Sequence, residues 1–234
     1  CRDYMPVQVT EKHLVQFQFY PDYLLRPDRL EYLTKIKHVY KKNEFLNDFN
    51  ITFSNIILDG GNIIKWKDKV IITDKIFSEN KNFKQSDIIN ELKKILECEI
   101  IIIPSYPNEE TGHADGLVRF IDEKTVLTYN LEIESGKIYV EWKDKFLNTF
   151  KDNKIEVKML PSVSEKEDVD NWAYLNFLQL NDLLILPIFN KNSDQIMVEF
   201  FKDTFKINIE TVYSKKIFDQ GGVLNCFTWN IKDE

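Results

Sequence analysis

One pattern recurs four times along this chain: two short apolar runs, a helical stretch and one more apolar run. A polar turn separates the two runs of each pair, which is the signature of a β-hairpin. The copies recur about every 50–60 residues, near the upper end of the periods that repeat proteins use. A unit of this kind cannot bury its own apolar face, so the copies must pack on one another.

The predicted strands form four hairpins, each followed by a helix and a single strand. The hairpins combine 5–9 with 14–19, 56–66 with 70–73, 117–121 with 126–129, and 172–180 with 183–189. The single strands are expected at 51–53, 100–103, 155–159 and 207–212. A last strand, from Val223 to Ile231, is expected to begin a fifth unit.

Four helices are expected between these strands, at about 27–40, 86–96, 138–150 and 194–205. In the second, Ile88, Leu92 and Leu96 recur at helical spacing, and Ser86 is expected to be the N-cap. The chain has only two alanines, while Ile, Lys, Asn and Phe are abundant, which lowers helix propensity and favours sheet.

A closed ring of such units would leave no unpaired sheet edge, so the repeat favours a radial α/β arrangement over a doubly wound sheet. The 234 residues fit a single domain, residues 1–234, with four units and the first strand of a fifth. The chain begins at Cys1 rather than Met, and its first residues already read as structured sequence. We therefore expect an N-terminal portion to be missing.

Composition excludes several classes of protein. Hydrophobic residues make up 43% of the chain, which is enough for a core and excludes a disordered tail. The net charge of −7 argues against binding of duplex nucleic acid. No apolar run approaches the length of a membrane span, and no signal peptide is visible. Three scattered cysteines do not make a disulfide framework or a thiolate zinc site, so reduced thiols in the cytoplasm are expected.

Polar residues stand at the same phase of the repeat, in front of each hairpin. The five segments are Arg2-Asp3-Tyr4-Met5-Pro6, Leu58-Asp59-Gly60-Gly61-Asn62, Gly112-His113-Ala114-Asp115-Gly116, Tyr174-Leu175-Asn176-Phe177 and Gly221-Gly222-Val223-Leu224-Asn225-Cys226. If the units share a pseudo-symmetry axis, these residues converge on it. Neighbouring glycines would let the backbone approach a ligand closely.

A thiol, an imidazole and several carboxylates make chemical sense together. Cys226 can attack as a thiolate once a neighbouring base such as His113 removes its proton. Additional carboxylates in such a pocket indicate a cationic substrate, and a guanidinium fits their geometry best. Taken singly, Asp59-Gly60-Gly61 is more typical of a turn, Cys226 of a small buried hydrophobe and Asn176 of backbone satisfaction. Their common phase in the repeat favours a site.

These segments, in this order, resemble the agmatine deiminase and Porphyromonas-type peptidylarginine deiminase family of guanidine-modifying enzymes, across essentially the whole chain. The His113-Ala114-Asp115 segment and the terminal Gly-Gly…Cys226 are the most specific elements. The resemblance implies the pentein fold, a five-bladed α/β propeller. It also implies that no metal or organic cofactor is needed.

The resemblance assigns a role to each candidate residue. Cys226 would be the nucleophile, His113 the proton shuttle and Asp59 the carboxylate that orients it. Asp3 and Asp115 would bind the guanidinium nitrogens, and Asn176 corresponds to a pocket asparagine. The implied partner is a small cationic guanidine, either agmatine or an arginyl group, with no nucleic acid and no membrane; a homo-oligomer stays open.

The pattern departs from that of agmatine deiminases at three positions. Those enzymes usually carry Glu where this chain has Asp59, Asn where it has Gly116 and His where it has Asn225. Agmatine hydrolysis to N-carbamoylputrescine is the leading hypothesis for the function. Peptidylarginine deimination and amidinotransfer are the enzymatic alternatives. A binding protein with a relict pocket is the non-enzymatic alternative, and a papain-like thiol hydrolase is a weaker one because its usual cysteine context is absent.

Overall fold

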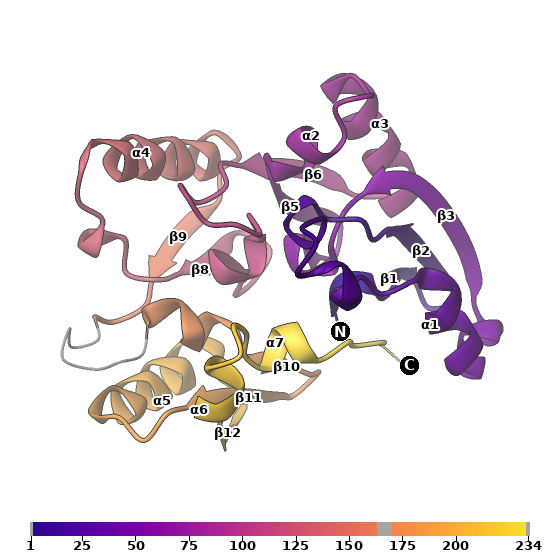
Figure 1. Cartoon of the computed structure of the whole chain (residues 1–234). Helices are drawn as coiled ribbons and strands as arrows, with labels where there is room; N and C mark the ends of the chain where they lie inside the picture. The colour runs from indigo at the N-terminus through magenta and orange to yellow at the C-terminus, as the bar shows by residue number, and fades with distance from the viewer. Residues whose placement is uncertain (1, 163–169, 233–234) are drawn as a thin grey trace. The chain divides into compact units, whose positions relative to one another are not determined.

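The computed structural model describes residues 2–162 and 170–232, and these contain four three-stranded sheets (Figure 1). Every sheet has the same pattern, an antiparallel hairpin whose second strand pairs in parallel with a third. Helical segments lie between the second and third strands. Parallel pairing requires such a crossover. The predicted hairpin–helix–strand repeat is therefore confirmed.

The chain divides into two compact units, of which the first comprises Cys1–Ala114 and Trp229–Glu234. Its first sheet consists of β1 (Val7–Thr10), β2 (His13–Gln18) and β3 (Asn50–Ile57), with α1 (Ile36–Lys42) between β2 and β3. Its second sheet consists of β4 (Ile64–Trp66), β5 (Lys69–Thr73) and β6 (Glu99–Ile103), with α2 (Lys75–Glu79) and α3 (Gln85–Leu96) between β5 and β6.

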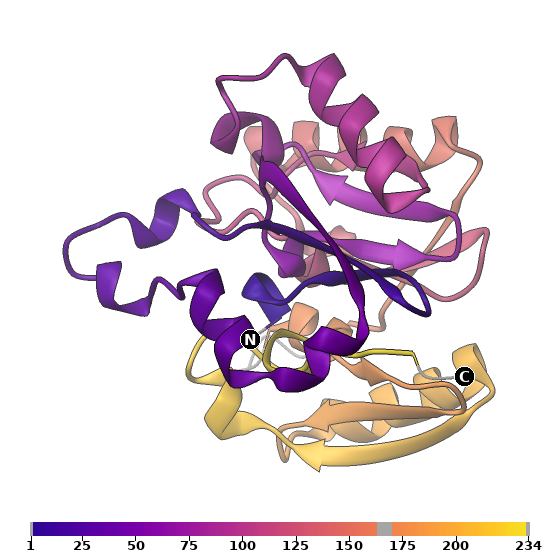
Figure 2. The same ribbon diagram turned by 90° about the vertical axis from the view of Figure 1, so that its right-hand side faces the viewer.

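Helix α3 lies along the second sheet (Figure 2) and buries Ile88, Leu92 and Leu96 in a core shared with the strands. These are the residues whose spacing predicted the helix. Lys84, with extended backbone, occupies the N-cap position, so Ser86 lies inside the first turn and the expected cap is wrong. The Ser86 hydroxyl instead donates to the neighbouring Asp87 carboxylate at 3.2 Å.

The C-terminal segment completes the first unit. The Trp229 indole packs with the cluster that contains Leu14 and Val39, and its N–H donates to the carbonyl of Pro6 at 2.7 Å. The backbone N–H of Lys232 donates to the side-chain oxygen of Gln8 at 2.7 Å. The first unit thus takes residues from both ends of the described chain.

The second unit comprises Asp115–Thr228. Its sheets consist of β7 (Val118–Phe120), β8 (Thr125–Thr128) and β9 (Glu156–Met159), and of β10 (Leu178–Gln179), β11 (Leu183–Ile188) and β12 (Asn208–Tyr213). Its helices are α4 (Lys137–Asp152), α5 (Asn192–Phe205), α6 (Lys215–Phe218) and α7 (Leu224–Phe227). In α4, Trp142, Phe146 and Phe150 are buried; Trp142 stacks on Phe146, and Phe150 meets Phe146 edge-on. The predicted helices at 138–150 and 194–205 are confirmed.

Four of the expected elements are wrong. The hairpin strand expected at 56–66 is limited to β4, because residues 56–57 end β3 and Gly60–Asn62 form a 3₁₀ turn. Instead of a helix over 27–40, the chain forms the 3₁₀ turn Leu30–Tyr32 and the short α1. The apolar residues of this stretch have little core to pack against, and Leu30 stays 50% exposed. The strand expected at 172–180 is reduced to β10, and its first four residues belong to the 3₁₀ turn Asn171–Leu175. The strand expected from Val223 to Ile231 is replaced by α7. No strand of the fifth unit therefore occurs among residues 223–231.

No helix in the described ranges combines the length and the apolar character needed to cross a membrane. A single domain over residues 1–234 stays a prediction.

Candidate active site

In the first unit, His113 and Asp59 form a close pair. Asp59 follows β3 and precedes the 3₁₀ turn Gly60–Asn62, while His113 ends a loop after β6. Nε2 of His113 lies 3.0 Å from Oδ2 of Asp59, and the two side chains are 12% and 3% exposed. A carboxylate at this distance accepts the Nε2–H of the imidazole and leaves Nδ1 as the basic nitrogen of the neutral ring.

The loop that carries His113 is held by backbone contacts. The Thr73 hydroxyl, at the end of β5, donates to the carbonyl of Gly112 at 2.5 Å, and the N–H of Gly112 donates to the Glu109 carboxylate at 2.5 Å. Gly112 has a φ of +65°, a conformation that glycine adopts at little cost. The Asn62 side chain accepts from the Thr73 N–H at 2.9 Å, which joins the Asp59 turn to the same strand end.

Asp3 lies on the other side of the imidazole. Its Oδ1 accepts the Gly61 N–H at 2.9 Å and lies 3.9 Å from Nδ1 of His113. A Cβ at position 61 would come within 2.5 Å of that Nδ1 and 2.7 Å of Asp3 Oδ1. Position 61 therefore requires glycine, because no real Cβ approaches other atoms so closely.

Two features of this cluster were not predicted. The Tyr23 hydroxyl donates to Asp59 Oδ2 at 2.8 Å, and its ring lies edge-on to the imidazole with centroids 6.0 Å apart. Among the described residues, the other carboxylate oxygen of Asp59 is buried without a hydrogen-bond partner. That oxygen keeps the capacity to accept a further donor.

In the second unit, the Asp115 carboxylate gathers three donors on Oδ2. The Asn225 amide donates at 2.8 Å, the Asn176 amide at 3.4 Å and the Cys226 thiol at 3.5 Å. Asp115, Asn176 and Asn225 are buried, and Cys226 is partly exposed. Burial of the carboxylate is tolerable because hydrogen bonds compensate its lost hydration.

The backbone around the thiol is held by Asn176. The N–H of Cys226 donates to the Asn176 side-chain oxygen at 3.1 Å, and the N–H of Asn225 donates to the Asn176 carbonyl at 3.0 Å. Gly222 lies against the cysteine, since a Cβ there would be 3.1 Å from that of Cys226. Asn225 is a second residue that the sequence did not assign to the site.

The six predicted residues thus fall into two clusters, with Asp3, Asp59 and His113 in the first unit and Asp115, Asn176 and Cys226 in the second. The expectation that five of them, Asp3, Asp59, His113, Asp115 and Cys226, meet in one pocket, with His113 near Cys226, stays a prediction. Within the described ranges, no group of three or more His, Cys, Asp and Glu side chains has the geometry to hold a metal ion.

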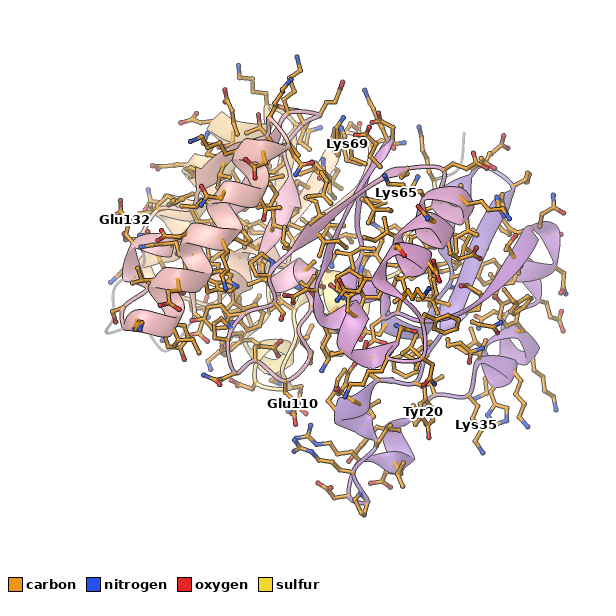
Figure 3. The ribbon with its side chains drawn as sticks, turned by 90° about the horizontal axis from the view of Figure 1, so that it is seen from above. Tyr20, Lys35, Lys65, Lys69, Glu110 and Glu132 are labelled. Atoms are coloured by element: carbon orange, nitrogen blue, oxygen red, sulfur yellow. The ribbon has the colours of Figure 1, made fainter. Side chains whose placement is uncertain are left out.

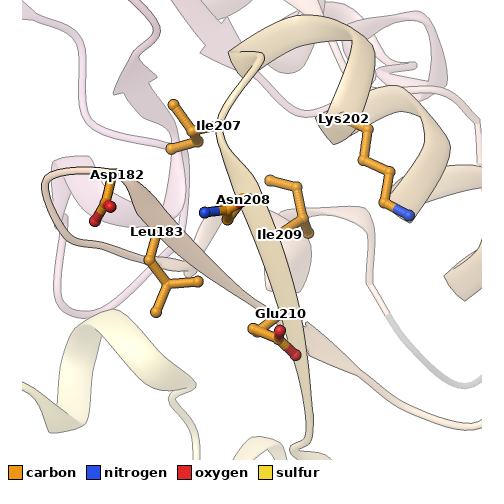
Figure 4. A pocket seen from close by; sticks show the side chains of 7 residues that line it. All are labelled: Asp182, Leu183, Lys202, Ile207, Asn208, Ile209 and Glu210. Carbon is orange, nitrogen blue, oxygen red and sulfur yellow. The ribbon is translucent and has the colours of Figure 1, made fainter.

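Two pockets lie elsewhere in the units. One, of about 530 Å³, is lined in the second unit by Asp182, Leu183, Lys202 and residues 207–210 (Figure 4). The other, of about 640 Å³, lies beside α1 in the first unit and includes Tyr4 and Trp229. None of the six predicted residues lines either pocket.

The model of the Porphyromonas-type peptidyl-arginine deiminase family matches residues 1–231, and the chain belongs to that family. The match covers both clusters.

Individual relatives agree with this assignment. A curated protein of Mycoplasma capricolum named "Putative agmatine deiminase" is 25% identical over 209 residues, which are 75% of this chain and 57% of that protein. This chain therefore spans little more than half the length of that relative.

Solved structures show the fold. The agmatine deiminase of C. jejuni has a TM-score of 0.74 at 21% identity, covering 96% of this chain and 70% of that one. An amidinotransferase of Microseira wollei has a TM-score of 0.62 at 14% identity, covering 99% of this chain and 67% of that one. The chain therefore has the mixed α/β pentein fold of small sheets that such deiminases and amidinotransferases share.

Proposed function

We propose that the complete protein is a thiol-dependent guanidine hydrolase, which converts a guanidinium group to a ureido group and releases ammonia. The observation that carries the proposal is the buried pairing of His113 with Asp59 at 3.0 Å in a chain of this family. Agmatine is the proposed substrate and N-carbamoylputrescine the product, because the curated relatives and several neighbours are named for that substrate.

In the first half of the proposed reaction, Nδ1 of His113 takes the thiol proton of Cys226 and the sulfur attacks the guanidinium carbon. The tetrahedral adduct then breaks one C–N bond, and the leaving nitrogen takes the proton back from His113 to depart as ammonia. An S-alkylthiouronium remains on Cys226. Such covalent catalysis replaces one difficult displacement by two easier steps.

In the second half, His113 takes a proton from water, and the resulting hydroxide adds to the same carbon. As the C–S bond breaks, the hydroxyl group of the adduct loses its proton to solvent water and becomes the ureido carbonyl. The Cys226 thiolate leaves and recovers its proton from the imidazolium. His113 acts as base and then as acid in both halves, and Asp59 orients the ring and stabilises its charged form.

Asp3 and Asp115 are proposed to bind the guanidinium nitrogens. Both carboxylates lie close to a reacting group of their own unit: Asp3 to His113 at 3.9 Å, and Asp115 to the Cys226 sulfur at 3.5 Å. A planar guanidinium presents several N–H donors, so one substrate group can engage two carboxylates. Asn176 is proposed to hold the nucleophile's backbone during attack.

The finer architecture is also part of the proposal. We propose that the complete protein is a five-bladed propeller in which this chain supplies four blades. The four sheets described support this proposal, as does the match of this chain to 70% of the C. jejuni agmatine deiminase.

The experiment is to incubate full-length protein with agmatine and, separately, with an arginyl peptide, measuring ureido product and ammonia. We expect agmatine turnover that Cys226→Ala abolishes. Cys98→Ala is the matched control: Cys98 is a buried residue of the other unit whose sulfur contacts the Lys67 carbonyl at 3.3 Å, and its loss should leave turnover intact.

The other outcomes decide between the alternatives. Turnover confined to the peptide would favour peptidylarginine deimination, and transfer of the amidino group to an added amine would favour an amidinotransferase. Absence of turnover on every substrate, in a protein that is folded, would favour the relict binding protein and overturn the proposal.

A further inference from the structure

Tyr23 contacts both members of the His113–Asp59 pair. Its hydroxyl donates at 2.8 Å to Asp59 Oδ2, the same oxygen that lies 3.0 Å from His113 Nε2. Its ring meets the imidazole edge-on, with an interplanar angle of 76°. One carboxylate oxygen therefore serves two donors, and the tyrosine ring supports the imidazole laterally.

The segment around Tyr23 is fastened to α2. The Asp22 carboxylate pairs with Nζ of Lys75 at 2.7 and 2.9 Å, and the backbone N–H of Asp22 donates to the Glu79 carboxylate at 3.4 Å. Both partners belong to the same short helix. The turn Asp22–Leu24 therefore holds the tyrosine at a defined distance from β5 and from Asp59.

The segment is also fastened to the loop that carries His113. Arg26 and Arg29 pair with the two oxygens of the Glu110 carboxylate at 2.5 and 2.6 Å (Glu110 is labelled in Figure 3). Glu110 precedes His113 by three residues. Anchors on both sides of Tyr23 thus reduce the freedom that its side chain would otherwise have in an exposed stretch of chain.

Tyr23 acts on Asp59 as a neutral donor. Burial raises the pKa of the Tyr23 hydroxyl far above its ordinary value, and the carboxylates of Asp59 and Asp3 raise this pKa further. The hydroxyl therefore keeps its proton throughout the physiological range. A hydrogen bond from a neutral donor spreads the negative charge of the carboxylate and weakens its attraction for a neighbouring imidazolium.

The charged groups around His113 in the first unit act in opposing directions. The carboxylates of Asp59 and Asp3 favour the imidazolium, whereas the Tyr23 hydroxyl reduces the effect of Asp59. Two charged residues of α2 act on His113 only indirectly: Lys75 pairs with Asp22, and Glu79 interacts electrostatically with Asp59. An imidazole can act as a base only in its neutral form, so a donor that reduces the attraction of a neighbouring carboxylate for the imidazolium favours that role.

We propose that Tyr23 is a positioning residue, whose hydroxyl fixes Asp59 so that His113 keeps its proton on Nε2 and presents Nδ1 as the base. The inference deepens the proposed function, since it rests on His113 being the proton shuttle. The proposal predicts that Tyr23 lowers the basicity of His113 and that the neutral ring has a single tautomer. Both properties can be measured without turnover.

The test is a pH titration of the His113 ring nitrogens by ¹⁵N NMR in full-length protein, with the signals assigned by their loss in His113→Gln. In the wild-type protein above the titration range, Nε2 should carry the proton. Tyr23→Phe keeps the ring and removes the hydroxyl, so the pKa of His113 should rise by about 0.5–1. Tyr40→Phe is the matched control, because the Tyr40 hydroxyl donates at 3.0 Å to Gln16 in the same unit, and it should leave the titration unchanged.

An unchanged His113 titration in a folded Tyr23→Phe variant would overturn the proposal. If that variant does not fold, the wild-type tautomer still decides: a proton on Nδ1 in the neutral ring contradicts it. In the active enzyme, the acid limb of the kcat/KM profile should move to higher pH by the same amount. A wild-type protein without turnover would instead contradict the proposed function and leave the NMR result standing.

Discussion

The side-chain oxygen of Asn176 accepts the backbone N–H of Cys226 at 3.1 Å, across 50 residues of sequence. The amide nitrogen of the same side chain faces the Asp115 carboxylate at 3.4 Å. These two contacts fix the orientation of the amide, since only its nitrogen can donate. One fully buried side chain therefore joins the backbone of the cysteine to the carboxylate beside its sulfur.

Asn176→Asp should strongly destabilise the protein. The change removes the donor to Asp115 and places a second carboxylate beside it, with neither charge able to reach water. We expect a loss of about 2–4 kcal/mol in the free energy of unfolding at pH 8, and a smaller loss at pH 5, where one carboxyl can be protonated. Urea unfolding at the two pH values measures this. Asn148→Asp, at an exposed position of α4, should change stability by less than about 0.5 kcal/mol, and equal effects of the two variants would refute the argument.

Gly61→Ala should displace His113 or Asp3. The new Cβ would come within 2.5 Å of the imidazole and 2.7 Å of the carboxylate, so one of them must move. We expect the His113 NMR signals to shift and kcat/KM to fall about 100-fold, as a displacement of about 1 Å commonly causes. Gly116→Ala is the control, since a Cβ there meets nothing within 4 Å, and it should keep the wild-type melting temperature. A Gly61→Ala protein with unchanged His113 signals would show that the close approach is absent in solution.

Glu79 should make stability depend on pH near neutrality. Burial, together with the Asp59 carboxylate, raises the pKa of Glu79 from 4.5 to about 7. The folded state therefore binds a proton that the unfolded state has lost, and the contribution of Glu79 to stability falls as pH rises from about 4.5 to about 7. Glu79→Gln removes this decline and should be more stable than wild type by about 1–2 kcal/mol at pH 8, but not at pH 4.

Urea unfolding of both proteins between pH 4 and pH 8 measures the difference. Glu91→Gln, at an exposed position of α3, should retain the wild-type pH dependence. Parallel stability curves for Glu79→Gln and wild type would contradict the raised pKa.

The sheets were predictable because at least one strand of each, such as β5, β8 or β11, contains a short apolar run bounded by polar turns. Helices with a full buried face were predictable as well: Phe146 and Phe150 of α4 are completely buried, and their spacing sufficed. The stretch from 27 to 40 has a comparable spacing, yet Leu30 and Tyr32 remain 50% and 66% exposed. Periodicity shows which residues could share a face, but not whether a core is present to receive that face.

The strand predicted from Val223 to Ile231 is wrong for a different reason. The segment is apolar enough for a strand, but the N–H groups of Asn225 and Cys226 donate to Asn176 instead of to a neighbouring strand. A strand needs a partner along its length, and these donors are already engaged by a residue 50 positions away.

The six predicted residues could be identified from the sequence because they share a common phase in the repeat. The structure places all six in the two clusters. Tyr23 and Asn225 were missed as site residues because their contacts depend on the fold: Tyr23 reaches Asp59 across 36 residues, and Asn225 reaches Asp115 across 110. Tyr23 also lies outside the repeated segments. Only the course of the chain after β2, which the sequence did not predict, brings it to Asp59.

The contacts of Trp229 and Lys232 with Pro6 and Gln8 have a consequence for biosynthesis. A ribosome delivers the chain from the N-terminus, so the first unit waits for residues made after the whole of Asp115–Thr228. Until then, the apolar cluster around Leu14 lacks its tryptophan. The first unit therefore cannot form these contacts until synthesis has passed residue 229, although most of its own sequence is made first.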